Sequence, residues 1–191
     1  YNFQELVPEL KSLGYVFRTR SDTEVIVHAW SAWGTACVHR LRGMFAFAIW
    51  DQKQQTLFMA RDRMGVKPLH YALLPDGTLV FGSELKVITA HPGFERQIDP
   101  QAVEDYFALG YVPDPRCIYR QAHKLPPAHT LTWRRGQVGQ PTPQPYWDVH
   151  FTLDNPISLA DAEAELRERV RESVRLRMIA DVPLGAFLSG G

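Results

Sequence analysis

Two stretches of the sequence carry residue types that could bind a ligand. The first consists of Ser189, Gly190 and Gly191, which follow the apolar run "VPLGAFL". A hydroxyl and consecutive backbone amides after a buried strand can donate hydrogen bonds to phosphate oxygens, above all where a helix follows. The triplet alone is weak evidence, because glycine pairs occur in many turns. Its place after an apolar strand favours a phosphate-binding loop.

The second stretch is "SDTE", in which Asp22 comes at the start of a helical pattern. An aspartate in the first turn of a helix usually does no more than complement the helix dipole. It could also bind the ammonium group of a small ligand through a charge-assisted hydrogen bond. The residues alone leave both interpretations open and favour the first.

A third group of charges follows a predicted strand in "ARDRMGVKPL". Gly65 and Pro68 within it are typical of a rigid turn. We expect this turn to lie near a domain junction, with at least one charged side chain paired internally. The charged residues are Arg61, Asp62, Arg63 and Lys67.

Histidine and cysteine give no sign of a metal site or a nucleophile. The seven histidines lack H-x-x-x-H spacing, and Cys37 and Cys117 lack C-x-x-C spacing, so we expect no metal ion in this chain. Without a neighbouring base, each cysteine is expected to be an inert small hydrophobic residue. Two such cysteines fit a reducing cytoplasm better than a disulfide scaffold.

The composition predicts a folded protein and disfavours several classes of partner. Hydrophobic residues make up 45% of the chain and charged residues 22%, as in ordinary globular proteins. The 21 basic residues balance the 21 acidic ones, so no net charge favours nucleic acid, an anionic membrane or a polyanionic substrate. No apolar run approaches a membrane span, and no signal-peptide pattern opens the chain. Because the sequence begins at Tyr1 and stops after two glycines, we expect both ends to be cuts in a longer protein.

The first 90 residues predict helices packed on antiparallel sheet, an α+β fold. Asn2 and Glu5 have the spacing of a capping box, for a helix that Gly14 ends. Ser21 is the expected N-cap of a second helix, which Gly34 ends. Strands are expected between short polar turns, which join neighbouring strands into hairpins. The expected strands are "YVFRT", "MFAFAIW", "TLFMAR", "KPLHYALL" and "TLVFGS".

A change of composition predicts a domain boundary in the second half. Asp99 and Pro100 are expected to open a helix. Seven of the 14 prolines fall within residues 113–145, which favours irregular or edge structure. A new domain is expected to start soon after. The three predicted parts are a first domain over residues 1–147, a linker over 148–157 and a second domain over 158–191.

The second domain is predicted to begin with a helix and a strand. Ser158 and Asp161 have the spacing of a helix cap. Oppositely charged residues four apart on this helix are expected to form ion pairs on a solvated face; the pairs are Glu163 with Arg167 and Glu165 with Arg169. The apolar run "DVPLGAFL" is predicted to be a buried strand of a parallel, α/β-type sheet.

Eight motifs occur along the chain in an order that resembles one protein family. Each is only moderately specific, whereas their shared order is very specific. The chain is similar to glutamine-hydrolysing asparagine synthetases and their relatives over essentially its whole length. The motifs are "YNFQEL", "SDTEV", "GMFAFAIWD", "ARDRMGVKPLHY", "GSELK", "GYVPDP", "KLPP" and "DVPLGAFLSGG".

The resemblance implies a fold and an activity. Members of the family have a class II glutamine amidotransferase domain, an Ntn-type α-β-β-α sandwich of antiparallel sheets, followed by an ATP-pyrophosphatase synthetase domain. The first domain hydrolyses glutamine, and ammonia passes through an internal tunnel to the second. There ATP, with Mg²⁺, adenylates a carboxylate that ammonia then attacks. The implied protein is a cytoplasmic ligase whose substrates are glutamine, ATP and aspartate or another carboxylate. It has no nucleic-acid or membrane partner, and a homodimer is compatible with it.

The resemblance assigns few roles to individual residues. Asp22 matches the aspartate that pairs with the α-ammonium of glutamine. Residues 189–191 match the first half of the pyrophosphate-binding loop, and Phe187 and Leu188 precede them in the ATP site, with the backbone of Phe187 near adenine. The catalytic cysteine and the Asn-Gly oxyanion donors are expected upstream of Tyr1. We therefore expect no catalytic residue in this chain, and no activity from this piece alone.

Three other functions are compatible with the same architecture. Similar proteins include β-lactam-forming synthetases that have lost the nucleophilic cysteine, and amidotransferases associated with exosortase or exopolysaccharide gene clusters. Residues 113–137 weakly resemble the latter. A non-catalytic binding module is the third. A cysteine directly after the initiator methionine and an Asp and a Ser after Gly191 would discriminate among them.

Overall fold

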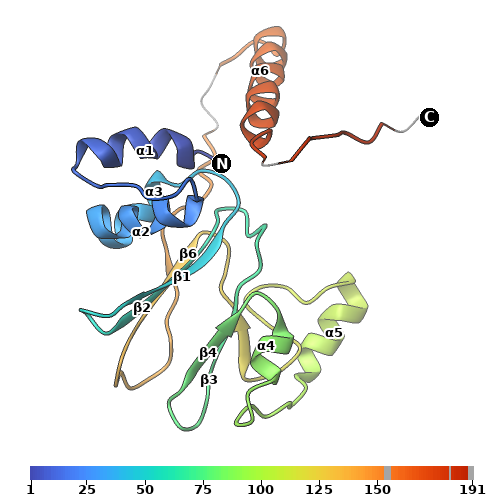
Figure 1. Ribbon diagram of the computed structural model, residues 1–191. Coiled ribbons are helices and arrows are strands. Elements are labelled where there is room, and N and C mark those ends of the chain that lie inside the picture. Colours follow the sequence, from blue (N-terminus) through green and yellow to red (C-terminus); the bar gives the residue numbers. More distant parts are fainter. Residues whose placement is uncertain (153–155, 181, 189–191) are drawn as a thin grey trace.

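Two antiparallel β-sheets are stacked face to face, with helices on their outer faces (Figure 1). The structure is a computed structural model that describes residues 1–152, 156–180 and 182–188. It confirms the predicted α+β fold. The first sheet has the order β1-β2-β6-β7 and the second the order β4-β3-β5. Their bounds are β1 Ala46–Asp51, β2 Thr56–Arg61, β3 His70–Leu73, β4 Leu79–Gly82, β5 Ala122–Lys124, β6 His129–Arg134 and β7 Gln144–Pro145.

Strand β2 is buried on both faces and connects two layers of the core. Phe58 and Ala60 pack against the helices, whereas Met59, between them, packs against the second sheet. Successive side chains of a strand point to opposite faces, which explains the uninterrupted apolar run in "TLFMAR". The layer between the sheets consists of Met59, Leu69, Tyr71, Leu125, Leu131 and Trp133.

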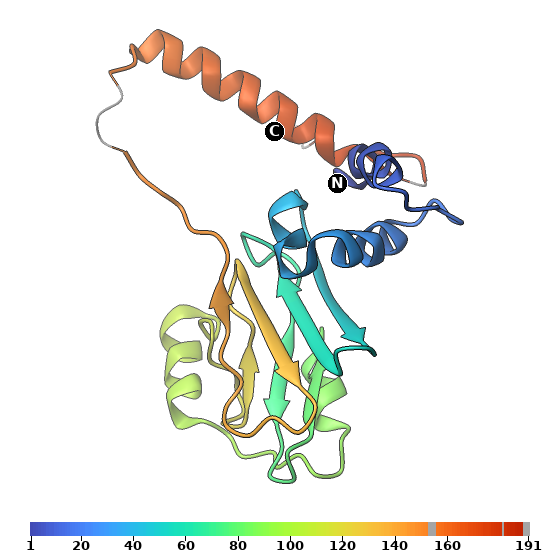
Figure 2. The same ribbon diagram turned by 90° about the vertical axis from the view of Figure 1, so that its left-hand side faces the viewer.

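The helices form separate groups around the sheets. The group on the first sheet consists of α1 Phe3–Ser12, α2 Asp22–Trp33, the 3₁₀ helix η1 Gly34–Ala36 and α3 Cys37–Arg40. The other group consists of α4 Leu85–Thr89 and α5 Pro100–Leu109. Helix α6, Leu159–Arg177, has no buried residue and lies beyond α1, away from both sheets (Figure 2). Among the described residues, no helix is both long and apolar enough to cross a membrane.

The predicted helix caps and ion pairs are present in the structure. The Ser21 hydroxyl accepts a hydrogen bond from the Thr23 amide at 3.1 Å, and α2 ends at Gly34 as predicted. The Ser158 hydroxyl accepts a hydrogen bond from the Asp161 amide at 3.2 Å at the start of α6. Both predicted ion pairs on α6 are present: Glu163 with Arg167 at 2.7 Å and Glu165 with Arg169 at 2.5 Å.

The strand predicted over residues 15–19 is wrong. This segment is a loop whose apolar side chains pack on α1 and α2. The rings of Tyr15 and Phe17 lie 5.1 Å and 4.7 Å from the ring of His28 on α2. The alternation of apolar residues therefore reflects packing against helices.

The capping box predicted at Asn2 is also wrong. The Asn2 side chain makes no cap hydrogen bond to α1. Its amide donates to the carbonyl of Arg40 at 2.9 Å, and its carbonyl accepts from the amide of Arg42 at 2.8 Å. Asn2 therefore links the start of α1 to the segment after α3.

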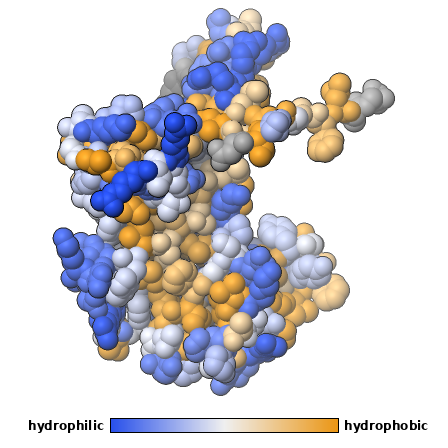
Figure 3. Space-filling model, viewed as in Figure 1, coloured by the Kyte–Doolittle hydropathy of each residue, from blue (hydrophilic) through white to orange (hydrophobic). Residues whose placement is uncertain are grey.

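The second half departs from the prediction in two places. Strand β6 lies inside the first sheet, between β2 and β7, where irregular or edge structure was expected. The predicted strand in "DVPLGAFL" is absent from described residues 182–188, whose apolar side chains project from the body of the molecule (Figure 3). A strand of a buried parallel sheet needs hydrogen-bonded neighbours on both sides, and no described strand pairs with this segment.

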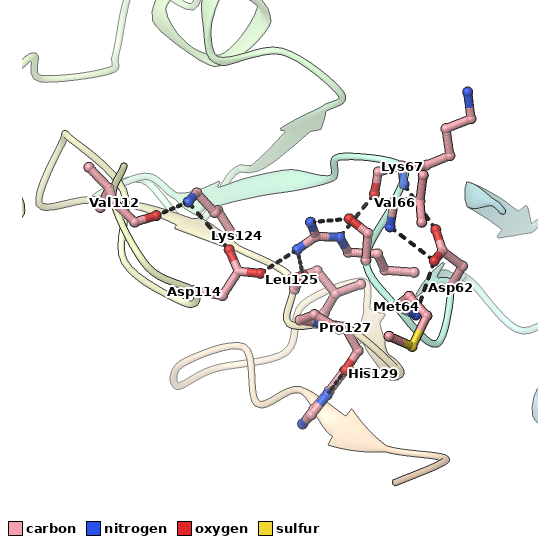
Figure 4. A network of polar contacts seen from close by, with 12 residues as sticks. Asp62, Met64, Val66, Lys67, Val112, Asp114, Lys124, Leu125, Pro127 and His129 are labelled. Atoms are coloured by element: carbon pink, nitrogen blue, oxygen red, sulfur yellow. Dashed lines mark hydrogen bonds and ion pairs between the residues drawn. The ribbon is translucent and has the colours of Figure 1, made fainter. Parts of the chain in front are cut away.

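The turn after β2 is held by two adjacent buried charges, Arg61 and Asp62 (Figure 4). The Asp62 carboxylate accepts hydrogen bonds from four backbone amides, at 2.9–3.3 Å. The donors are Phe45, Met64, Val66 and Lys67. The predicted internal pairing in this cluster is therefore confirmed.

Arg61 extends the same network to the second sheet. Its guanidinium donates to the carbonyls of Gly65, Lys67 and Leu125 at 2.7–2.9 Å. It also forms an ion pair with Asp114 at 2.9 Å, and Asp114 in turn pairs with Lys124 of β5 at 3.3 Å. The buried cluster thus connects the end of β2, the turn that follows it and β5.

Substitution of Asp62 tests how much this network stabilises the fold. In the 191-residue chain, Asp62→Ala is expected to lower the free energy of unfolding by about 3–5 kcal/mol, because four backbone amides lose their buried, charged acceptor. Urea denaturation followed by circular dichroism measures the change. As a control, Asp76→Ala removes one acceptor in an exposed turn and should lower it by less than about 1 kcal/mol. Equal small losses in both variants would contradict the stabilising role.

Candidate functional site

The loop before α2 fixes the position of Asp22, the first residue of that helix. The half-buried Glu24 carboxylate accepts hydrogen bonds from the amides of Arg18 at 2.8 Å and Thr19 at 2.7 Å. It also accepts one from the Thr19 hydroxyl at 2.5 Å. Residue 24 therefore holds the incoming loop, and Ser21 caps the helix. Together they give Asp22 a defined place.

The carboxylate of Asp22 has few partners of its own. Its side chain is exposed, and among the described residues it accepts only two weak hydrogen bonds, from the Ser21 hydroxyl at 3.4 Å and the Thr23 hydroxyl at 3.5 Å. No ion pair involves it within the described parts of the chain. Its negative charge is therefore available to a ligand.

Asp22 lines a cavity of about 590 Å³ beside the N-terminus. In Figure 1 this end of the chain lies next to the C-terminal end of α6, and the Arg177 guanidinium stands 5.4 Å from the Tyr1 ring. The cavity wall combines apolar side chains with one acid and two bases. Its lining residues are Tyr1, Phe3, Arg20, Ser21, Asp22, Met44, Lys67, Ile179 and Ala180.

Asp22 is the one acidic residue in the wall of this cavity, and its side chain is exposed. An ammonium group placed in the cavity would face this carboxylate. A carboxylate in such a setting can bind an ammonium through a charge-assisted hydrogen bond that contributes roughly 1.5–3 kcal/mol.

The sequence reasoning found Asp22 but missed the rest of this wall. Arg20, Met44 and Lys67 come from three separate segments, and no local pattern indicates that they meet. Lys67 was expected to be a candidate for internal pairing, yet its side chain is exposed and faces the cavity. Only the folded chain brings these residues to Asp22.

The residues assigned to an ATP site are not brought to this cavity. Phe187 and Leu188 are almost fully exposed, at 110% and 95% relative accessibility, so they form no adenine pocket with the described residues. Ser189, Gly190 and Gly191 lie outside the described residues. Their assignment to pyrophosphate stays a prediction.

The two cysteines and the possible metal ligands form no further candidate site among the described residues. Cys37 and Cys117 are buried and unpaired, and burial raises the pKa of the Cys37 thiol to about 11 and that of Cys117 above its usual range. Protonated buried thiols are poor nucleophiles. In the part of the chain that the structure describes, no group of three or more histidine, cysteine or acidic residues could hold a metal ion.

Comparison with known proteins identifies the family. Residues 1–147 match the family described as "Glutamine amidotransferase domain". The chain belongs to this family. Residues 165–191 of the same chain match the family described as "Asparagine synthase". The amidotransferase match covers both sheets and the helices around them, together with Asp22 and most of the cavity wall.

Curated relatives of this amidotransferase domain match along its whole length. Two proteins of Bacillus subtilis (strain 168), "Asparagine synthetase [glutamine-hydrolyzing] 3" and "1", are 38% and 35% identical over 100% of the chain. The chain spans 30% and 29% of these two relatives, so it corresponds to less than a third of their length.

A solved structure supports the fold. Glutamine phosphoribosylpyrophosphate amidotransferase from B. subtilis superposes with a TM-score of 0.51 at 20% identity, over 76% of this chain and 27% of that one. At this identity the likeness concerns the fold alone. It agrees with the predicted Ntn-type sandwich of antiparallel sheets.

The pKa of Glu24 predicts how pH affects the loop that positions Asp22. Hydrogen bonds from the Thr19 side chain and the Arg18 amide lower this pKa from 4.5 to about 2. Because the folded state has the lower pKa, the ionised carboxylate stabilises folding above pH 4.5, and this contribution is lost as the pH falls to about 2. The stability difference between wild type and Glu24→Gln should therefore be largest above pH 4.5 and disappear as the pH falls through about 2.

Urea denaturation at a series of pH values measures this difference. Glu104→Gln is the matched control, since within the described residues the Glu104 carboxylate accepts a hydrogen bond only from Gln101, an exposed side chain on α5. A difference for Glu24→Gln that stays constant with pH would show that its carboxylate does not hold the loop through its charge.

Proposed function

We propose that this chain is the glutamine-binding part of a glutamine-dependent asparagine synthetase. In the proposed reaction, glutamine and water give glutamate and ammonia, and ammonia replaces AMP on an adenylated aspartate to give asparagine. The observation that carries the proposal is the order of the two family matches, with an amidotransferase domain followed by the start of an asparagine synthase region in one chain. Relatives named for this activity match the whole chain.

In this proposal Asp22 binds the α-ammonium of glutamine. Three observations support the role: the carboxylate starts α2, it has no ion-pair partner among the described residues, and it lines a cavity with a partly apolar wall. Helix-dipole complementation explains its position but not the cavity in front of it. Both effects can act on the same carboxylate.

The synthetase half of the proposal concerns residues 158–191, after a domain over 1–147 and a linker over 148–157. ATP with Mg²⁺ would bind here, with the backbone of Phe187 near adenine, Leu188 beside it and residues 189–191 at the pyrophosphate. The match of residues 165–191 supports this assignment. The acceptor is proposed to be aspartate, in a cytoplasmic enzyme that needs no nucleic-acid or membrane partner and is compatible with a homodimer.

The Asp22→Asn variant of the full-length protein tests the proposal. We expect its kcat/KM for glutamine to fall by about 10- to 100-fold, since a neutral amide loses the charge-assisted bond to the ammonium group. Synthesis with free ammonia should be unchanged, because ammonia does not need the glutamine site. Asparagine formation from aspartate and ATP, with either nitrogen source, is the measurement.

The experiment has a matched control and outcomes that would contradict the proposal. Asp76→Asn, a carboxylate in an exposed turn between β3 and β4, serves as the control and should leave both activities unchanged. Equal loss of the glutamine-dependent and ammonia-dependent activities in Asp22→Asn would rule out the assigned role. Full activity with another carboxylate and none with aspartate would replace asparagine synthesis by a related ligation.

A further inference from the structure

Another cavity, of about 890 Å³, opens at the end of the sandwich away from the N-terminus. The turn between β3 and β4 and the loop between β6 and β7 border it, and Figure 2 shows both at the end opposite α1 and α2. Its wall includes Tyr71 of β3, Arg120 and Gln121 before β5, His123 of β5 and Trp133 of β6. No residue of this wall lines the cavity described above. The volume falls within the range of about 300–1,000 Å³ that is typical of ligand pockets.

The strand register directs three aromatic side chains into the space between the sheets. Tyr71 and His123 are direct cross-strand neighbours on β3 and β5, and their ring centres lie 5.5 Å apart. Residues directly opposite on paired strands project from the same face of a sheet. Trp133 comes from the other sheet and belongs to the same core layer as Tyr71. Both sheets therefore contribute aromatic rings to one cavity.

Several polar groups of this wall have no hydrogen-bond partner. The Gln121 Oε1 atom is buried and accepts no hydrogen bond. Within described residues 1–152, the Tyr71 hydroxyl, the Trp133 indole N–H and the His123 ring form none either. Tyr71 and Trp133 are only 5% and 8% exposed, and at such burial these polar groups usually have a partner. Four unpartnered groups in one cavity indicate a site that receives a polar ligand or ordered water.

The interior of this cavity is uncharged, and a free cation lies at its edge. Burial lowers the pKa of His123, so its ring is neutral at pH 7. The exposed Arg120 guanidinium donates from Nε to the carbonyl of Ile98 at 3.3 Å. Its terminal nitrogens form no ion pair with the described carboxylates. The Asp76 carboxylate, the acid of this wall, accepts a hydrogen bond from the Thr78 amide in its own turn.

The side-chain amide of Gln121 indicates the kind of ligand. It has an acceptor, Oε1, next to a donor, Nε2, and neither forms a hydrogen bond in the described parts of the chain. A glutamine amide pairs with a nucleobase edge that carries a donor beside an acceptor, such as N6 and N7 of adenine. Because Oε1 is buried, the amide must rotate about its side-chain bonds to make this contact. Aromatic rings provide apolar surface for a planar base, and a guanidinium binds phosphate.

We propose that this cavity binds a nucleoside monophosphate, with the base against the aromatic rings and hydrogen-bonded to Gln121, and the phosphate at Arg120. The site is separate from the ATP region proposed for residues 187–191, and it does not depend on the role of Asp22. Its two polar contacts are independent of each other. Loss of one contact should therefore leave the other intact.

NMR spectroscopy of the 191-residue chain tests the proposal. Its five tryptophans give separate indole N–H signals, and Trp133→Phe identifies the signal of Trp133. We expect AMP to shift this signal in a saturable way and adenosine to do so with an affinity about 10-fold lower, because it lacks the phosphate. Inorganic phosphate should leave it unchanged. The signal of Trp50, half exposed on β1, is the internal control and should not move.

Substitutions separate the two contacts. Gln121→Leu should weaken the binding of AMP and adenosine alike, by about 10-fold. Arg120→Met should lower the affinity for AMP to that for adenosine and leave adenosine within about two-fold. The matched controls are Gln101→Leu and Arg96→Met, which replace exposed side chains outside the cavity wall. Neither control should change either affinity.

The thermal midpoint distinguishes a binding group from a structural one. Since the buried Gln121 Oε1 has no partner, Gln121→Leu should raise the midpoint by about 2–4 °C while it weakens binding. A fall in the midpoint together with lost binding would show that the amide supports the fold instead of the ligand. Arg120→Met replaces an exposed side chain, so it tests the phosphate contact whatever the outcome at Gln121.

Three results would overturn the proposal. If AMP causes no saturable shift of the Trp133 signal, the unpartnered groups bind water alone. An equal shift with inorganic phosphate would reduce the cavity to an anion site without recognition of a base. Unchanged affinity for AMP in Gln121→Leu would show that the base does not contact this amide.

Discussion

Two adjacent buried charges at the end of β2 hold together the parts of the molecule that matter for its site. Arg61 and Asp62 do not neutralise each other. Each instead forms hydrogen bonds with main-chain groups of other segments. These bonds fix the turn after β2, the residue directly before β1 and the chain next to β5. Apolar packing between the sheets alone would not specify the path of this turn.

Two separate sets of hydrogen bonds position the wall of the candidate cavity. On one side Glu24 binds the loop before α2, and this anchor places Asp22. On the other side Asp62 and Arg61 bind the amide and carbonyl of Lys67. Each anchor uses a carboxylate or guanidinium to hold backbone, so the ligand-facing side chains stay free. An acid and a base are thereby presented to one cavity.

Much of the fold was predictable because the signals are local. Ser21 and Ser158 cap their helices, and β2 begins and ends where the sequence indicates, since these outcomes depend on neighbouring residues. Errors arose where packing decided the structure. Tyr15 and Phe17 alternate like a strand but pack against a helix. Strand β6 forms although the prolines around it favour irregular structure. Its pairing with β2 and the burial of the apolar side chains of β6 override that preference.

The sequence by itself determined the fold class, the order of most elements, the family and the candidate role of Asp22. The order of the motifs and the helix caps depends only on residues that are close together in the sequence, so both can be predicted without any tertiary contact. Only the tertiary structure decided that Arg61 and Asp62 hold the backbone of Lys67 and that the Lys67 side chain shares a cavity with Asp22. The physical reason is that a cavity forms from segments far apart in sequence. Their meeting depends on how the sheets and helices pack, which no local spacing encodes.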